Sequence, residues 1–133
     1  IGWPGDLPDK TWAGWVSNAV PAYIKTNDIV KLLGAPGIVP NAATAVSALA
    51  AGTNGGRAVI LYQVAETNNS AAVLFSSSNF TNTASGQATL ATTALPYGDK
   101  GFIVFRKGGD GAVLQARQST NTNIIGEFVA VAP

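Results

Sequence analysis

Acid–base or metal chemistry in this chain would have to come from its seven Asp and Glu and its eight Lys and Arg side chains, because it has no His and no Cys. Without an imidazole or a thiol, Ser-His-Asp catalysis, Cys-His catalysis, thiolate metal sites and disulfides are all excluded. No Ser is followed three residues later by a Lys, so a Ser-x-x-Lys motif is absent as well. These residue types therefore favour a protein that is not an enzyme.

The best metal candidate is Asp110, within the run Gly108-Gly109-Asp110-Gly111. A phosphate loop would need a helix after the glycines, whereas a strand-like run follows here. Calcium takes about six to eight oxygen ligands, so Asp110 would need Asp99, backbone carbonyls or Asn side chains beside it. We interpret the run as a tight turn without metal; calcium binding is the alternative, with Asp99 and Asp110 as the candidate ligands. As a glycosidase pair they are predicted to lie too far apart, because a strand of about 20 Å separates them.

These two aspartates bracket the first strand of the clearest hairpin in the sequence. Residues 101–107 and 112–118 carry the Phe, Ile and Val that favour strands, and the glycines and Asp between them suit a tight reversal. The basic pair Arg106-Lys107 ends the first strand. We interpret it as exposed charge that discourages edge-to-edge aggregation, with partner binding as the alternative.

A helical pattern precedes the hairpin. Apolar residues at three- to four-residue spacing predict a helix from Trp12 to Tyr23, and Pro21 is expected to end or kink it. Asp9 or Thr11 is expected to be its N-cap. The tryptophans of this helix are predicted to pack in the core, because their spacing is helical.

The remaining elements complete an α+β pattern. Residues 1–10 are predicted to form an extended lead-in, and further helices are predicted over 26–33 and 41–52. Strands are predicted over 57–65, 71–75 and 124–131, with a weak strand or an irregular loop at 88–91. The prediction is a single domain over residues 1–133, truncated at its N-terminus because the sequence has no Met at position 1. In this domain N-terminal helices pack on a four- to five-stranded antiparallel sheet.

Composition narrows the classes of partner. Charged residues make up 11% of the chain and its formal net charge is +1. Phosphate neutralisation needs several clustered cations, so nucleic-acid binding is not expected. No apolar run approaches the length of a membrane span. A surface rich in Thr, Asn, Ser and Gly is more typical of proteins outside the cell.

The run from Gly101 to Gly111, followed by Thr120-Asn121-Thr122-Asn123-Ile124-Ile125-Gly126, resembles the C-terminal half of bacterial type II secretion pseudopilins and type IV pilin-like proteins. Members of that family begin with an apolar helix, preceded by a cleavage Gly, and many close the C-terminal region with a disulfide. Neither that N-terminal helix nor a disulfide is present in this sequence. The helix-first, sheet-last order agrees with a pilin-like fold.

The resemblance implies a non-catalytic structural subunit of a pseudopilus or type IV pilus-like fibre, with no cofactor except calcium. Its partners would be other pilin-like subunits in a helical fibre, and the inner membrane through the missing N-terminal helix. Its place would be the bacterial cell envelope, on the periplasmic or extracellular side. In major pseudopilins a C-terminal loop binds calcium, which again points to Asp99 and Asp110.

An extracellular adhesion or carbohydrate-binding module is the alternative function. It depends on aromatic side chains that could stack on sugar rings if they are exposed together in a groove. The candidates are Trp3, Trp12, Trp15, Tyr62 and Tyr97.

Overall fold

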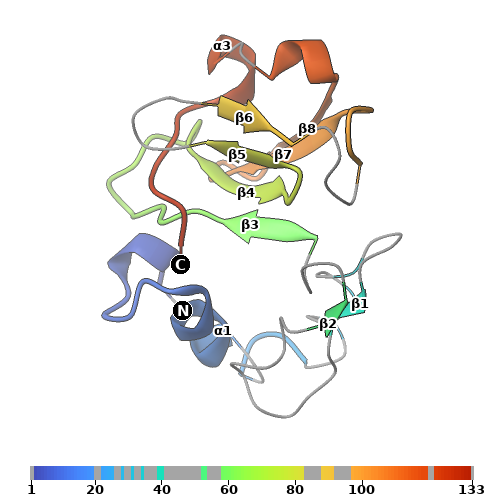
Figure 1. Ribbon diagram of the computed structural model, residues 1–133. Coiled ribbons are helices and arrows are strands. Elements are labelled where there is room, and N and C mark those ends of the chain that lie inside the picture. Colours follow the sequence, from blue (N-terminus) through green and yellow to red (C-terminus); the bar gives the residue numbers. More distant parts are fainter. Residues whose placement is uncertain are drawn as a thin grey trace.

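Antiparallel strands and short helices make up the computed structural model, so the coarse α+β prediction is confirmed (Figure 1). The structure describes residues 2–19, 22–25, 28, 31, 34, 39–40, 52–53, 58–82, 88–91, 97–119 and 122–132. Its elements are η1 (Pro4–Asp6), α1 (Trp12–Ala19), β1 (Val39–Pro40), β2 (Gly52–Thr53), β3 (Val59–Leu61), β4 (Val73–Ser77), β5 (Phe80–Asn82), β6 (Ala88–Leu90), β7 (Phe102–Arg106), β8 (Gly111–Leu114), η3 (Ala116–Gln118) and α3 (Thr122–Ile125).

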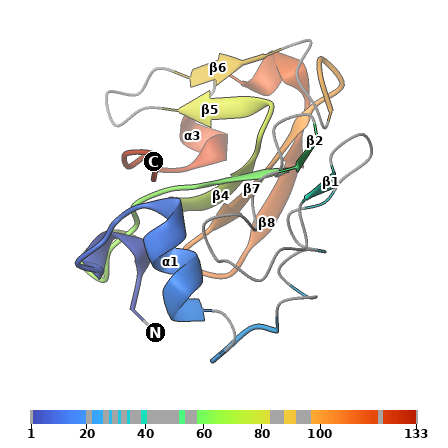
Figure 2. The ribbon, with the colours of Figure 1, turned by 60° about the horizontal axis from the view of Figure 1, so that its bottom comes forward.

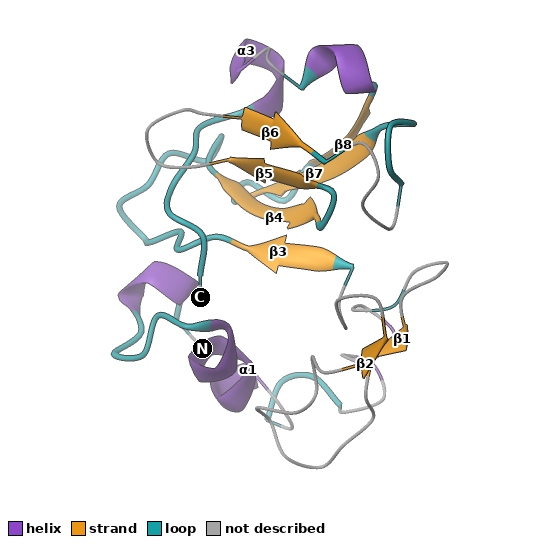
Figure 3. Ribbon diagram, in the orientation of Figure 1, coloured by secondary structure: helices purple, strands orange, loops and turns teal. Residues whose placement is uncertain are grey.

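The main sheet has four strands in the order β3-β4-β7-β8, and every neighbouring pair is antiparallel (Figure 3). Two small sheets, β1-β2 and β5-β6, lie outside it. The pairing of β6 with β5 confirms the weak strand predicted at 88–91. On the β3 side the C-terminal segment covers the sheet edge, because Gln63 N–H donates to Ala130 O and Ala132 N–H donates to Leu61 O, both at 2.8 Å.

The predicted hairpin is β7 and β8. Phe105 lies opposite Gly111, and Phe102 lies opposite Leu114. Gly109 has a φ of 95°, a conformation that glycine adopts without the strain of a Cβ. The turn is closed by the Arg106 N–H, which donates to Asp110 O at 2.8 Å. The sequence-based turn prediction is confirmed here.

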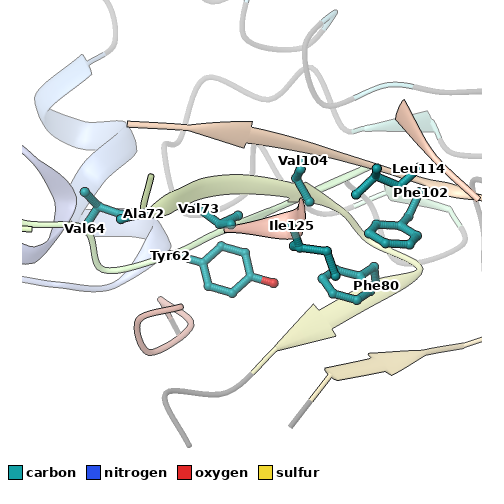
Figure 4. Packing of buried hydrophobic residues seen from close by; sticks show 9 residues of the cluster. All are labelled: Tyr62, Val64, Ala72, Val73, Phe80, Phe102, Val104, Leu114 and Ile125. Atoms are coloured by element: carbon teal, nitrogen blue, oxygen red, sulfur yellow. The ribbon is translucent and has the colours of Figure 1, made fainter. Parts of the chain in front are cut away.

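One face of the main sheet carries the larger core. Alternate residues of a strand point to the same face, and Phe102, Val104 and Leu114 accordingly point into one cluster (Figure 4). The Phe80 ring from β5 stacks on Phe102 with 4.2 Å between ring centroids. Tyr62 is completely buried beside them, and its hydroxyl lies 2.9 Å from Ser76 Oγ.

A second, smaller cluster joins α1 to the opposite face of the sheet. Figure 2 shows α1 beside the sheet. Thr11 is the N-cap of this helix, since its Oγ1 accepts a hydrogen bond from Gly14 N–H at 3.1 Å. Trp12 and Val16 are buried against β3, and Trp15 meets the Phe75 ring edge-on at 5.8 Å between centroids. Packing of both helix tryptophans, as predicted, joins the helix to β3 and β4.

Two strand predictions near the C-terminus are wrong. The predicted strand over 112–118 ends at Leu114, and the 3-10 helix η3 follows it. The predicted strand over 124–131 is instead the end of α3 followed by irregular chain, which touches the sheet through isolated bridges at Glu127 and Val131. Gly126 has a φ of 129°, which breaks the strand geometry that the surrounding apolar residues favour.

One further prediction is wrong, and others fall mainly on residues that the structure does not describe. Residues 2–10 are not an extended lead-in, because they contain η1 and bond to the loop after β3. The predicted helices over 26–33 and 41–52 lie mostly outside the described residues. Pro21 also lies outside them, and α1 ends at Ala19.

Candidate interaction surface

Arg106 is bound within the fold, which corrects the prediction of an exposed strand end. Its Nε donates to Ile125 O at 2.9 Å and its Nη2 donates to Ile124 O at 2.5 Å. Its Nη1 forms an ion pair with Asp110 at 2.6 Å, and its side chain is 15% exposed. The last carbonyls of a helix have no partner within the helix. Arg106 supplies donors to those of α3 and so fastens α3 to the hairpin.

Lys107 is also bound within the fold rather than free at a strand end. Its ammonium donates to Glu66 O at 2.6 Å and to Asn68 O at 2.8 Å. The same ammonium lies 5.1 Å from the centroid of the Trp3 ring, within range of a cation–π interaction. Lys107 therefore connects the hairpin, the loop after β3 and the N-terminal segment.

The N-terminal segment makes further polar contacts with the same loop. Trp3 Nε1 donates to a Glu66 carboxylate oxygen at 2.5 Å, and the Glu66 N–H donates to Asp6 Oδ2 at 2.7 Å. In the backbone, Gly5 N–H donates to Val64 O at 2.8 Å. We call Trp3, Asp6, Glu66 and Lys107 the N-terminal clamp. Sequence reasoning missed it, because the hydrogen bonds that hold it join residues 41 to 63 positions apart and no local pattern indicates such pairs.

The structure does not bring the two candidate calcium ligands together. Asp99 lies in the exposed turn before β7, and Asp110 follows the other end of that strand. Asp110 is already paired with Arg106. Within the described ranges, no three acidic side chains gather into a group that could hold a metal ion. Calcium at these residues stays a prediction.

Apolar side chains are exposed on the hairpin, on the face opposite the larger core. Val113 is 82% exposed, Phe105 is 40% exposed and Ile103 is 37% exposed. Ile103 and Val113 lie opposite each other in the ladder, so their side chains share this face. We call Ile103, Phe105 and Val113 the outer patch. Pockets of about 320 and 420 Å³ adjoin it, and both include Ile103 and Tyr97 in their walls.

A third pocket, of about 250 Å³, lies between the N-terminal segment and α1. Three aromatic side chains line it: Trp3, Trp15 and Tyr23. Trp12 and Tyr62 are 6% and 0% exposed, so neither can stack on a sugar. Of the aromatic residues proposed from sequence for sugar stacking, Trp3 and Trp15 line this pocket. Tyr23, which was not proposed, lines it with them.

The walls of these three pockets contain no carboxylate among the described residues. A two-acid hydrolytic site needs both acids within about 10 Å of each other across the bound sugar. The pockets offer apolar and aromatic contact instead.

Comparisons with protein-family models, with curated proteins and with solved structures found no match to this chain. Among the described residues, no helix has both the length and the apolar character needed to span a bilayer. The N-terminal clamp, the outer patch and the aromatic pocket are the features of the described residues that bear on function.

Proposed function

We propose that this chain is the head domain of a non-catalytic, pilin-like fibre subunit of the bacterial cell envelope, on its periplasmic or extracellular side. In this proposal an apolar helix upstream of Ile1 anchors the subunit in the inner membrane. The same helix later packs with other pilin-like subunits in a helical fibre. Such assembly is head-to-tail and open-ended.

The N-terminal clamp carries the proposal. A head domain in a regular fibre needs one orientation relative to its anchoring helix, and that orientation has to be imposed where the chain enters the domain. Here the entering segment is held by the Trp3–Glu66 hydrogen bond, the Glu66–Asp6 hydrogen bond and the ammonium of Lys107. The helix-first order with α1 on the sheet also supports a pilin-like arrangement.

The upstream coding sequence of the parent gene tests this function directly. We expect a stretch of about twenty apolar residues there, the length that a membrane-spanning helix requires. We also expect the full-length product to fractionate with membranes and, when assembled, with sheared surface fibres. A parent gene without an apolar stretch, or a product absent from both fractions, contradicts the proposal.

Calcium binding is part of this proposal, because the resemblance to pseudopilins implies a calcium-binding loop near the C-terminus. Asp99 is exposed in its turn, whereas Asp110 would have to exchange Arg106 for the ion. Thermal unfolding with calcium and with a chelator tests the assignment. A calcium-dependent rise in Tm that the Asp99→Asn variant abolishes supports it. No change in Tm removes calcium from the proposal.

Carbohydrate binding is the second candidate, and the aromatic pocket is the observation that favours it. Trp15 of this pocket lies in the middle of α1, and Tyr23 lies in the turn after the helix. Aromatic faces of this kind can stack on apolar sugar faces. A screen against immobilised oligosaccharides tests it, with Trp15→Ala as the variant and Tyr97→Ala as the control outside the pocket. Binding that survives Trp15→Ala, or no binding at all, removes this candidate.

A further inference from the structure

The loop after β3 contains the tripeptide Asn68-Asn69-Ser70, which matches the Asn-x-Ser/Thr acceptor pattern of N-linked glycans. A second match, Asn79-Phe80-Thr81, begins in the turn between β4 and β5. Such tripeptides recur by chance in a chain rich in Asn, Ser and Thr, so the pattern alone selects neither site. The structure separates the two, because a transferase can modify only an amide nitrogen that it can reach.

Asn79 is closed to modification in the folded chain. The residue is 1% exposed. Its Nδ2 donates to Gly98 O at 3.1 Å and to Gly101 O at 2.7 Å, so both amide hydrogens are already bound. A sugar on this nitrogen would displace at least one of these bonds and would need space that the fold fills.

Asn68 has the opposite environment. It is half-buried, and the flanking residues 66–67 and 69–70 are exposed. Its Oδ1 accepts a hydrogen bond from the Ala65 N–H at 2.6 Å, which fixes the orientation of the side chain. Within the described residues no hydrogen bond involves Asn68 Nδ2, and this atom is not one of their buried unpaired atoms. Solvent therefore reaches the nitrogen to which a sugar would be attached.

Ser70 supplies the hydroxyl that the pattern requires two residues after the acceptor. It is exposed, and its Oγ lies 3.4 Å from Asn69 Oδ1, a long contact that an enzyme can replace. The backbone holds the loop in place, because Asn68 O accepts from the Lys107 ammonium at 2.8 Å and Ser70 O accepts from the Gly108 N–H at 2.9 Å. Attachment of a sugar at Nδ2 changes neither of these carbonyls, so the folded loop can carry a glycan without losing them.

We infer that Asn68 is an acceptor site for an N-linked oligosaccharide. The donor is an oligosaccharide carried on a lipid diphosphate, and a membrane-bound transferase catalyses the step. A bond forms between Asn68 Nδ2 and the anomeric carbon of the sugar, while the bond from that carbon to the diphosphate oxygen breaks. The lipid diphosphate leaves with the electron pair, and Nδ2 releases one proton to water.

The modified side chain keeps its Oδ1, and so keeps the hydrogen bond from Ala65. The glycan adds a bulky, solubilising group to the surface beside the N-terminal clamp. The site is a property of the folded loop, so it does not depend on fibre assembly.

Transfer to the purified, folded chain tests the inference. The reaction contains a transferase that recognises the Asn-x-Ser/Thr tripeptide and a lipid-diphosphate-linked oligosaccharide, and intact-mass spectrometry counts the glycans added. We expect a single glycan, which fragmentation locates at Asn68. Ser70→Ala should abolish it, and Ser70→Thr should retain it. Thr81→Ala, the matched control in the second tripeptide, should leave it in place. Circular dichroism checks that the variants fold.

Synthetic peptides separate the effect of the tripeptide from that of the fold. Peptides of residues 64–72 and 76–83 should both accept the glycan, because neither is held in the folded structure. The inference is overturned if the folded chain accepts no glycan, whether or not the 64–72 peptide does. It is overturned equally if Ser70→Ala retains the glycan, or if the folded chain is modified at Asn79.

Discussion

The ammonium of Lys107 lies 5.1 Å from the centroid of the Trp3 ring, which joins the hairpin to the segment where the chain enters the domain. The same group donates to the carbonyls of Glu66 and Asn68. A single cation thus satisfies two backbone acceptors while it covers an aromatic face. This arrangement makes Lys107 the centre of the N-terminal clamp.

Removal of that ammonium is expected to lower the free energy of unfolding. Lys107→Ala leaves the Glu66 and Asn68 carbonyls without their donor, and we expect a loss of about 1–2 kcal/mol. Lys100→Ala, in the exposed turn before β7, serves as the matched control and should change stability by less than about 0.5 kcal/mol. Urea unfolding measures both. Equal effects for the two variants contradict a clamp at Lys107.

Arg106 should be more sensitive to replacement than its ionic partner. A Lys at this position cannot donate in a planar fork to Ile124 O, Ile125 O and Asp110 together, so Arg106→Lys is expected to cost about 1.5–3 kcal/mol. Asp110→Asn removes only an exposed ion pair and is expected to cost about 0–1 kcal/mol. Thermal unfolding at low and high salt separates the two. A larger loss for Asp110→Asn would show that the ion pair, rather than the α3 carbonyls, is the important contact.

Two glycines with positive φ should respond differently to a methyl group. At Gly126 a Cβ would collide with the carbonyl oxygen of Ala71, whereas at Gly109 nothing lies within 4 Å. Gly126→Ala is expected to cost about 3 kcal/mol, from backbone strain and collision together. Gly109→Ala carries the strain alone, about 1–2 kcal/mol. Denaturant unfolding tests the order, and a Gly109 variant that is the less stable of the two contradicts the structure.

Asp9 should titrate below its usual range. The Thr11 hydroxyl donates to Asp9 Oδ1 at 2.7 Å and the Thr11 N–H donates to it at 3.1 Å, and these bonds lower the pKa of Asp9 from 3.8. A lowered folded-state pKa gives stability that is present above pH 3.8 and lost as the pH falls through the folded value. NMR titration should show the Asp9 pKa rising in Thr11→Ala and unchanged in Thr11→Ser. An equal pKa in all three proteins would rule out Thr11 as the cause.

The elements predicted correctly from sequence are those that short-range residue patterns determine. The β7–β8 hairpin follows from its glycine turn, and α1 follows from the spacing of Trp12 and Val16 behind the Thr11 cap. The strand predicted at 124–131 failed because tertiary contacts outweigh strand propensity there. Arg106 binds the α3 carbonyls, and Gly126 turns the chain away from an extended course.

The candidate surfaces were less predictable than the fold. Lys107 was interpreted as exposed because strands often end in charge, yet its acceptors come from residues 66–68. Asp6 and Glu66 carried no signal of each other, since a contact across about sixty residues leaves no periodicity in the sequence.

Two backbone hydrogen bonds just after β3 determine how the domain would respond to tension between its ends. Gly5 is bonded to Val64, and the adjoining Gln63 is bonded to Ala130, so the two ends of the described chain hold neighbouring residues. A pull between those ends would load this short bridge and, through Lys107, the hairpin turn that follows β7. Within the described part of the chain, the load would then fall first on a few backbone bonds at one border of the sheet, ahead of the larger core.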